Sequence, residues 1–420
     1  MNRLFAAALL GTSLTPMTAL AADLAGVVQT YTAIAEAGYE DSLITAQALR
    51  DAVGKLVAAP SAETLVGARA AWLAARDPYQ QTEVYRFGNA IVDDWEGRVN
   101  AWPLDEGLID YVDANGYVQS SDNELATLNV IATPEFTLSG KQIDAREITP
   151  ELISEVLHEA DGIEANVASG YHAIEFLLWG QDLNGTGPGA GDRPWTDFVQ
   201  GDGCTGGNCD RRSAYLVAAT DLLVTDLEEM LANWQDGGAA RAAVVEDPQA
   251  GLLAILTGMG SLSYGEQAGE RMKLGLMLND PEEEHDCFSD NTHNSHYYDG
   301  LGIRNVYLGS YSRIDGTVVA GPSLSDLVAV TDADVDARLK AELDTTVEAL
   351  AAIKAAAENG FAYDQMLAPG SAEGEALIMS AVDALVTQTA SIERAVAALG
   401  LSKVDFEGSD SLDNPEAVFQ

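Results

Sequence analysis

Residues 151–180, ELISEVLHEADGIEANVASGYHAIEFLLWG, form the stretch that decides the fold. Small or apolar residues recur in it at alternating spacings of three and four, which is the seam of a helical bundle. The seam positions are Ile153, Val156, Ala160, Ile163, Val167, Gly170, Ile174 and Leu177. Because Ala165, Ala168 and Phe176 make the opposite side small or apolar too, the pattern predicts one helix buried between two layers, ending at Trp179 with Gly180 as its C-cap.

The rest of the chain repeats this helical periodicity, and alternating strand-like runs are scarce. The pattern predicts a helix after Ser61, which suits an N-cap, and a new start or kink at Pro78. The other expected helices and irregular segments are helices near 24–59, 62–75, 211–234, 247–278, 323–359 and 371–399, and loops over 97–145 and 279–322. The predicted fold class is therefore all-α.

The length of the chain indicates two packed units. At 420 residues it exceeds the size at which a single core usually stops growing, about 250–300 residues. Residues 182–210 are rich in Gly and polar side chains, so we place the boundary there, between an N-terminal helical bundle domain (22–200) and a C-terminal one (201–420). A duplicated four-helix bundle would suit two such halves, although they do not align residue by residue.

The charge balance limits the partners. The chain has 22 Lys and Arg against 66 Asp and Glu, a formal net charge of -44, while 47% of its residues are hydrophobic, which excludes intrinsic disorder. Nucleic acid or anionic lipid would have to bind against this negative field, whereas metal cations would be attracted. Most of these carboxylates fit a simpler interpretation, a solvated surface of the kind found in high-salt habitats.

The first residues follow the pattern of a secretory signal peptide. Asn2 and Arg3 precede an apolar run, and Ala19 and Ala21 form a small-residue cleavage site, so residues 1–21 are expected to be removed. No later run is apolar and long enough to span a bilayer. We expect a soluble, exported and periplasmic mature protein.

The cysteine spacing predicts one disulfide. Cys204 and Cys209 lie in GDGCTGGNCDRR, whose glycines permit a tight loop, and an exported protein meets an oxidising compartment. The spacing fits neither haem attachment nor the usual zinc pair. Cys287 is then left as a buried thiol or as one partner of a different pairing.

His172 and Glu175 are the first candidate metal ligands. At i and i+3 they project together from one helix face, and an imidazole and a carboxylate so placed can both ligate one ion. The alternative is a His–Glu pair with a structural role, which such spacing often gives.

Two further patches combine suitable side chains. Tyr79, Glu83 and Arg86 share one face after Pro78, where the alternative is an exposed ion pair beside a half-buried Tyr. The segment 282–299 holds three of the five histidines among several acids, a composition that suits hard or borderline metals. These residues are His285, His293, His296, Asp286, Asp290 and Asp299, and the alternative is a hydrogen-bonded loop that caps its neighbours.

Several segments resemble one protein family. GYHAIEFLLWG (170–180) matches the GxHxxE motif of the imelysin family, which is also classed as peptidase family M75. Other segments are similar to its iron-regulated protein A branch, namely ARDPYQQTEVYRFGNAIVDDWEG, NAWPLDEGLIDYV, GERM, EEEHDCFSDNTH and NVYLG. The CTGGNC loop looks like an insertion relative to the family pattern.

The resemblance implies two helical bundles packed on each other, an exported location, a link to iron uptake and a site around the motif at the bundle interface. Carried over to this chain, the motif residues are Gly170, His172 and Glu175, and Glu83 would supply the acid from a facing helix. Asp105, Asp290 and His293 are secondary candidates for completing the site. Tyr79, Arg86 and Arg271 would surround it or anchor an anionic chelate.

These observations favour an exported protein that binds iron, as an ion or a chelate, in iron uptake or homeostasis, with other envelope iron-uptake proteins as partners. Zinc and haem are alternative ligands, since His and Tyr can both bind haem iron. A metallopeptidase with a non-standard metal site is the second hypothesis, because the chain has neither HExxH nor HxxEH. The third is a helical adaptor for another envelope protein.

Overall fold

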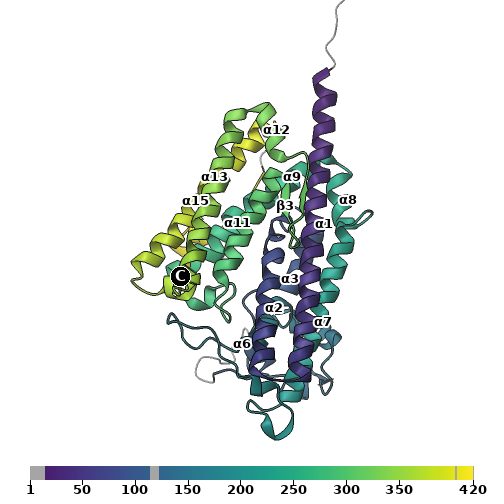
Figure 1. Ribbon diagram of the computed structural model, residues 1–420, viewed down its shortest axis with the longest axis vertical. Coiled ribbons are helices and arrows are strands. Elements are labelled where there is room, and N and C mark those ends of the chain that lie inside the picture. The colour runs from purple at the N-terminus through teal and green to yellow at the C-terminus, as the bar shows by residue number, and fades with distance from the viewer. Residues whose placement is uncertain (1–14, 114–122, 403, 420) are drawn as a thin grey trace, which may run out of the picture.

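The chain folds into long helices joined by irregular loops (Figure 1) in a computed structural model that describes residues 15–113, 123–402 and 404–419, with side chains from residue 24 onward. The α-helices are α1 (Thr15–Ala58), α2 (Ala62–Gln80), α3 (Ala90–Asn100), α4 (Glu106–Ile109), α5 (Pro150–Leu152), α6 (Gly170–Trp179), α7 (Cys209–Trp234), α8 (Ala239–Val245), α9 (Pro248–Ser261), α10 (Leu274–Leu278), α11 (Thr292–Leu308), α12 (Leu324–Thr331), α13 (Ala333–Glu358), α14 (Tyr363–Leu367), α15 (Ala372–Ala398) and α16 (Asp410–Asp413). The 3-10 turns are Glu83–Tyr85, Ala160–Gly162, Trp195–Phe198, Gly201–Gly203, Pro281–Glu283 and Ala417–Phe419, and π-helical geometry covers Ile153–Leu157 and Leu262–Lys273. The predicted all-α class is confirmed.

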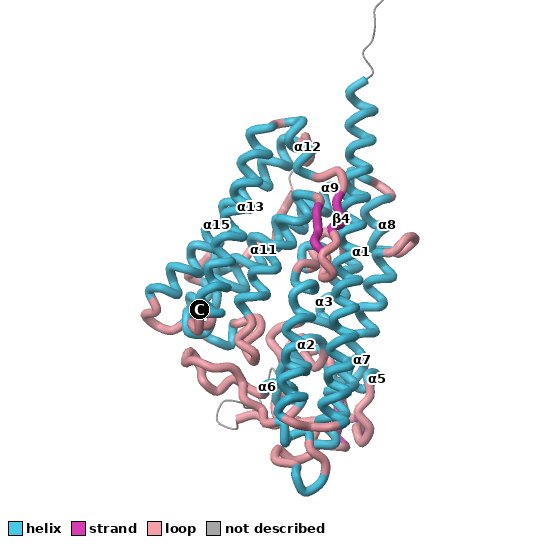
Figure 2. Tube along the Cα trace, in the orientation of Figure 1, coloured by secondary structure: helices cyan, strands magenta, loops and turns pink. Residues whose placement is uncertain are grey.

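Only short strands interrupt the helices in the described part of the chain. β1 (Glu135–Leu138) pairs antiparallel with β2 (Lys141–Asp144), and β3 (Ser310–Ser312) pairs antiparallel with β4 (Val318–Ala320). Figure 2 shows the β3–β4 hairpin beside α1. Asp41 of α1 holds it there, because its carboxylate accepts hydrogen bonds from Tyr311 and Arg313.

The first bundle is built on α1, which packs against α2 and α7 (Figure 1). The turn between α1 and α2 is defined by a capping box, in which Ser61 accepts from the Thr64 backbone N–H and the Thr64 hydroxyl accepts from the Ser61 N–H, so Ser61 is the N-cap that the sequence predicts. Buried aromatic rings join the helices, and the Tyr39 and Trp234 rings stack at 6.4 Å.

A second group of helices, α11, α13 and α15, lies beside the first bundle (Figure 1). It shares the main core through residues such as Ile303 and Leu343, and it has a smaller core of its own that includes Met272, Leu350 and Ile378. The predicted domain boundary between residues 200 and 201 falls in the loop before α7. Since α7 packs along α1, both sides of this position contribute helices to the first bundle, and the domain division stays a prediction.

The structure corrects three predicted elements. Residues 151–179 are not one helix, because Glu159 and Asp161 adopt left-handed φ values of 51° and 60° and break the chain into short turns before α6. Asp tolerates this conformation through local hydrogen bonding. The apolar residues of the predicted seam are therefore carried by a folded loop and not by one helix. α2 continues through Pro78, which lies in its last turn, and the expected loop 279–322 contains α11.

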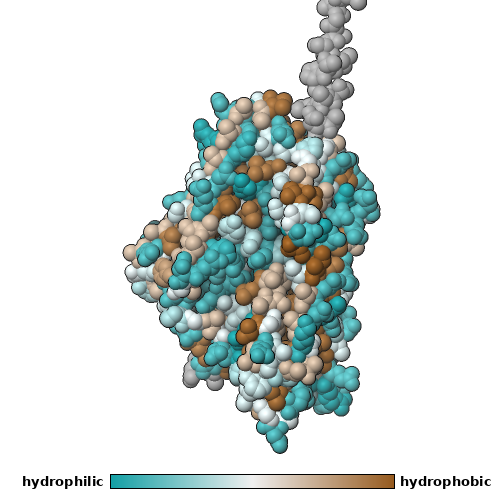
Figure 3. Space-filling view, in the orientation of Figure 1, coloured by the Kyte–Doolittle hydropathy of each residue, from teal (hydrophilic) through white to brown (hydrophobic). Residues whose placement is uncertain are grey.

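The face drawn in Figure 3 mixes hydrophilic and hydrophobic residues. Among the helices of the described residues, none is both long and apolar enough to cross a bilayer. The first 14 residues of the predicted signal peptide lie outside the described residues, and its remaining positions fall at the start of α1.

Candidate metal centre

Gly170 sets the position of the GxHxxE motif. It is the first residue of α6 and has a φ of 79°, a conformation that side chains with a Cβ disfavour. A Cβ at this position would also meet the backbone of Val99 at the end of α3, only 2.5 Å from the carbonyl carbon. The motif glycine therefore lets α6 begin directly against α3, where Ser169 donates a hydrogen bond to the Arg98 carbonyl.

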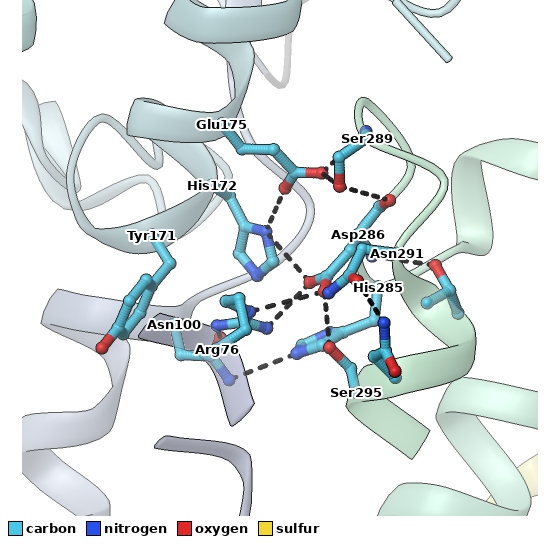
Figure 4. A network of polar contacts seen from close by, with 12 residues as sticks. Arg76, Asn100, Tyr171, His172, Glu175, His285, Asp286, Ser289, Asn291 and Ser295 are labelled. Atoms are coloured by element: carbon cyan, nitrogen blue, oxygen red, sulfur yellow. Dashed lines mark hydrogen bonds and ion pairs between the residues drawn. The ribbon is translucent and has the colours of Figure 1, made fainter. Parts of the chain in front are cut away.

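His172 and Glu175 point toward each other from α6, and both side chains are fully buried. Nδ1 of His172 lies 3.1 Å from Oε2 of Glu175 (Figure 4). The other oxygen of Glu175 accepts from the Ser289 backbone N–H and hydroxyl, at 2.9 and 2.6 Å. Burial and the Asp286 charge raise the pKa of Glu175 well above its ordinary value. When Glu175 is ionised, it accepts the Nδ1–H of His172, and Nε2 then has a free lone pair.

The loop before α11 brings two more donors to His172. The centroids of the His172 and His285 rings are 4.9 Å apart, and Nδ1 of His172 is 3.9 Å from Oδ1 of Asp286. Donor atoms of His172, His285 and Asp286 all lie within 4.8 Å of one another. We call these three residues the His172 centre.

Arg76 of α2 holds Asp286 in place from the other side. The guanidinium makes two hydrogen bonds to the Asp286 carboxylate, at 2.8 and 3.4 Å, and a third to Asn100. Asn100 is in turn 3.2 Å from Nε2 of His285 (Figure 4). Ser295 donates to the second Asp286 oxygen at 2.5 Å. The centre is thus supported by side chains from both groups of helices.

Burial and neighbouring charges set the protonation of the centre. Burial and the Arg76 cation lower the pKa of His172 to about 3, and burial lowers the pKa of His285 well below its usual value. Burial alone would raise the pKa of Asp286, but Arg76 keeps it below its ordinary value. Both imidazoles are therefore neutral at pH 7 and Asp286 is ionised, which are the protonation states that bind a metal.

The hydrogen bonding of Nε2 of His172 indicates whether these residues suit a cation. Nε2 of His172 has no hydrogen-bond partner although the side chain is fully buried, a state that normally costs free energy. Two imidazoles and one carboxylate form a donor set that borderline divalent ions such as Fe²⁺ and Zn²⁺ accept. The residues therefore fit a metal ion, with Glu175 orienting His172.

Glu83 is not part of the His172 centre. Its carboxylate is 2.7 Å from the guanidinium of Arg271, which also pairs with Glu266 and Asp299 at 2.8 and 3.1 Å. Arg86 borders the same group and contacts Glu266, Glu96 and the more exposed Asp93. The acids outnumber the two arginines here, and burial followed by the Glu83 charge raises the pKa of Glu96 to about 7.

The remaining candidates lie outside the centre. Asp105 caps α4 and accepts from Asn123, Tyr79 packs its ring 4.8 Å from that of Tyr171, and His293 lies on the first turn of α11. Asp290 shares its loop with Asp286 but does not join the three donors. Cys204 and Cys209 form the disulfide that the sequence predicts, whereas Cys287 is a separate buried thiol.

Sequence reasoning recognised His285 and Asp286 as members of the loop patch but selected Asp290 and His293 from it. Arg76 and Asn100 carried no signal, because an Arg and an Asn on helices suggest exposed positions. Spacing along a loop cannot say which side chain turns inward.

Comparisons with known proteins agree with the resemblance. The family model described as Imelysin matches residues 35–392. The Iron-regulated protein A of Synechococcus elongatus is 34% identical over 88 residues, which are 20% of this chain and only 25% of that protein.

Two solved structures share the fold. An iron-regulated protein A precursor from Parabacteroides distasonis superposes with a TM-score of 0.64 at 18% identity, over 90% of this chain and 95% of the other. An imelysin-like protein from Psychrobacter arcticum gives 0.54 at 17% identity, over 90% and 98% of the two chains. Because the family model covers most of its length, this chain belongs to the imelysin family, peptidase family M75.

Proposed function

We propose that this protein binds an iron ion at the His172 centre and serves iron uptake or homeostasis in the cell envelope. The observation that carries the proposal is the buried, unpartnered Nε2 of His172 beside His285 and Asp286. Two histidines and one carboxylate suit Fe²⁺. The name of the Synechococcus relative, Iron-regulated protein A, supports iron over other borderline metals.

The burial of the centre favours a bare ion over a large ligand. His172, Glu175 and Asp286 are 0% exposed and His285 is 4% exposed. Haem or a bulky chelate would need the bundles to separate, whereas an ion needs only the donors already present. The Arg76 charge would oppose a cation but also keeps Asp286 ionised, so affinity depends on the balance of these two effects.

Calorimetric titration tests the proposal, with anaerobic Fe²⁺, Fe³⁺ and Zn²⁺ added to the mature protein. We expect His172→Ala and His285→Ala to lose iron binding, because each removes one of three donors. His293→Ala is the matched control, since it removes a nearby histidine outside the centre. Glu83→Gln should bind nearly as the wild type does. Unchanged iron affinity in both His172→Ala and His285→Ala would contradict the proposal.

The proposal excludes general peptidase activity. A buried centre gives a peptide no access to the metal, and Glu175, the acid closest to His172 in the motif, is committed to Ser289 and His172. We expect no metal-dependent cleavage of casein by wild type that disappears in His172→Ala. Such cleavage would favour a metallopeptidase instead.

Export is part of the same proposal. It rests on the sequence of residues 1–21. Amino-terminal sequencing of protein from a periplasmic extract should begin at Ala22. A chain that keeps Met1 in the cytoplasmic fraction would contradict export.

A further inference from the structure

Trp102 covers the His172 centre from the segment between α3 and α4. Its ring centroid lies 4.9 Å from that of His172, in an edge-to-face arrangement. The indole is half-buried, so it reaches both solvent and an imidazole that is 0% exposed. Glu175, His285 and Asp286, which also border His172, are buried. On this side of the centre, one indole therefore separates the imidazole from solvent.

The indole is held in this position by weak contacts. Its ring packs edge-to-face on Phe288, with the centroids 5.7 Å apart, and its Nε1–H donates to the backbone carbonyl of Glu282 at 3.3 Å. This hydrogen bond is long and lies at the surface, where water competes for both groups. Trp102 also lies outside the helices, after α3 ends at Asn100. The indole can therefore move away without breaking a helix.

Both partners of the indole lie on the loop that carries the metal donors. Glu282 precedes His285 along this loop, and Phe288 follows Asp286. Phe288 is 1% exposed and packs its ring 5.4 Å from that of Phe176 in α6. The loop is thus anchored independently of the indole, by this packing and by the ion pair that holds Asp286. Movement of the indole uncovers His172 while the donors keep their places.

We propose that Trp102 is the gate through which a metal ion enters and leaves the His172 centre. The inference rests on the proposed function, since the gate leads to the same donors. A displaced indole leaves an opening of its own size, which admits a partly hydrated ion and still excludes a large chelate. Glu282 is exposed and Glu283 half-buried on the turn beside it, so negative charge at the outer end attracts cations.

The indole supplies no ligand atom to the ion, which separates its role from that of the donors. Loss of a donor weakens binding at equilibrium. Loss of the gate instead speeds entry and exit together, because the free and bound states keep the same ligand set. The gate is therefore recognised by rates and by access to His172, and not by affinity.

The first test measures access to His172 in the metal-free protein, with diethyl pyrocarbonate as the probe. This reagent acylates neutral imidazole nitrogens, and Nε2 of His172 has no hydrogen-bond partner. Mass spectrometry of peptides gives a modification rate for each histidine. His293 and His296 of α11 are internal references. Burial lowers the pKa of His172 and His296 to about 3 and that of His293 to about 4, so all three are neutral.

The variants are Trp102→Ala and Trp102→Phe, with Trp195→Ala as the matched control, because Trp195 is 36% exposed in a separate 3-10 turn. We expect His172 to react about tenfold faster or more in Trp102→Ala, less accelerated in Trp102→Phe, and unchanged in Trp195→Ala. His293 and His296 should keep their wild-type rates. An unchanged His172 rate in both Trp102 variants would overturn the proposal. If Trp102→Ala also accelerates the buried His296, that variant is unfolded and Trp102→Phe decides.

The second test separates the gate from the proposed function. Stopped-flow mixing with Zn²⁺ or anaerobic Fe²⁺ should give faster association and faster dissociation in Trp102→Ala than in Trp195→Ala, with nearly the same affinity. A protein that binds neither ion but reacts faster at His172 in Trp102→Ala contradicts the proposed function, not the gating of His172. Metal binding with unchanged rates in both Trp102 variants would overturn the gate and leave the proposed function standing.

Discussion

Replacing Gly170 by alanine should destabilise the protein severely. The left-handed φ of 79° costs about 1–2 kcal/mol once a Cβ is present. The new methyl group would also fall on the Val99 backbone, 2.5 Å from its carbonyl carbon, and forced backbone shifts of this kind cost about 1–3 kcal/mol. Since no flexible side chain can move aside, the two effects together predict a loss of about 2–5 kcal/mol.

The matched control is Gly67→Ala in α2. Gly67 is exposed, and an added Cβ there meets nothing within 4 Å, so helix propensity alone predicts a gain of about 0.5–1 kcal/mol. Urea unfolding followed by circular dichroism compares the two variants with wild type. The reasoning is refuted if Gly170→Ala unfolds at the same urea concentration as wild type or Gly67→Ala. A folded Gly170→Ala protein should still bind iron more weakly, since α6 must shift and His172 lies two residues along it.

Three other perturbations follow from the same contacts. Arg76→Met leaves Asp286 buried without its partner, so urea unfolding should show a loss of about 3–5 kcal/mol, and adding Asp286→Asn should recover part of it. The pKa of His172 is about 3 in the folded protein and about 6.5 in the unfolded chain, so between these pH values only the unfolded chain binds the proton. The free energy of unfolding should therefore fall by up to about 1.4 kcal/mol per pH unit as the pH drops from 6.5 to 3. His172→Gln should show a shallower fall. Reducing Cys204–Cys209 opens a short loop and should cost roughly 2 kcal/mol, and a thermal midpoint unchanged by reductant would contradict this.

The sequence predicts helix ends well where residues within one turn determine them. Ser61 starts α2 because its hydroxyl accepts from the Thr64 backbone N–H and the Thr64 hydroxyl accepts from the Ser61 N–H, so both partners lie within four residues. The 151–179 helix failed for the opposite reason. Most of its seam positions are buried, although Val156 and Ile163 are half-buried and Ala165, on the opposite side, is exposed. Burial does not require a helix, and Glu159 and Asp161 turn the chain with left-handed φ values that apolar spacing does not predict.

The site was predictable only in part. His172 and Glu175 face each other because they are three positions apart on one helix, a spacing that can be seen in the sequence. Their remaining partners depend on how the loop before α11 folds against α2 and α6. Glu83 was the reasonable choice from the motif, yet Arg271 pairs with it, and this pairing joins positions 188 residues apart that no local pattern links.

The residues that form and support the His172 centre lie far apart in the sequence, and this determines when the ion can bind. Arg76 and Asp286 are 210 positions apart, and Glu175 and Ser289 are 114 apart, so no short peptide of this protein carries the centre. Contacts of such high sequence separation form late in folding, after the loops between them have closed. A chain that crosses a membrane unfolded would therefore meet its ion only in the compartment where it folds, and the metal supply of that compartment, as much as the ligand set, would decide which ion is bound.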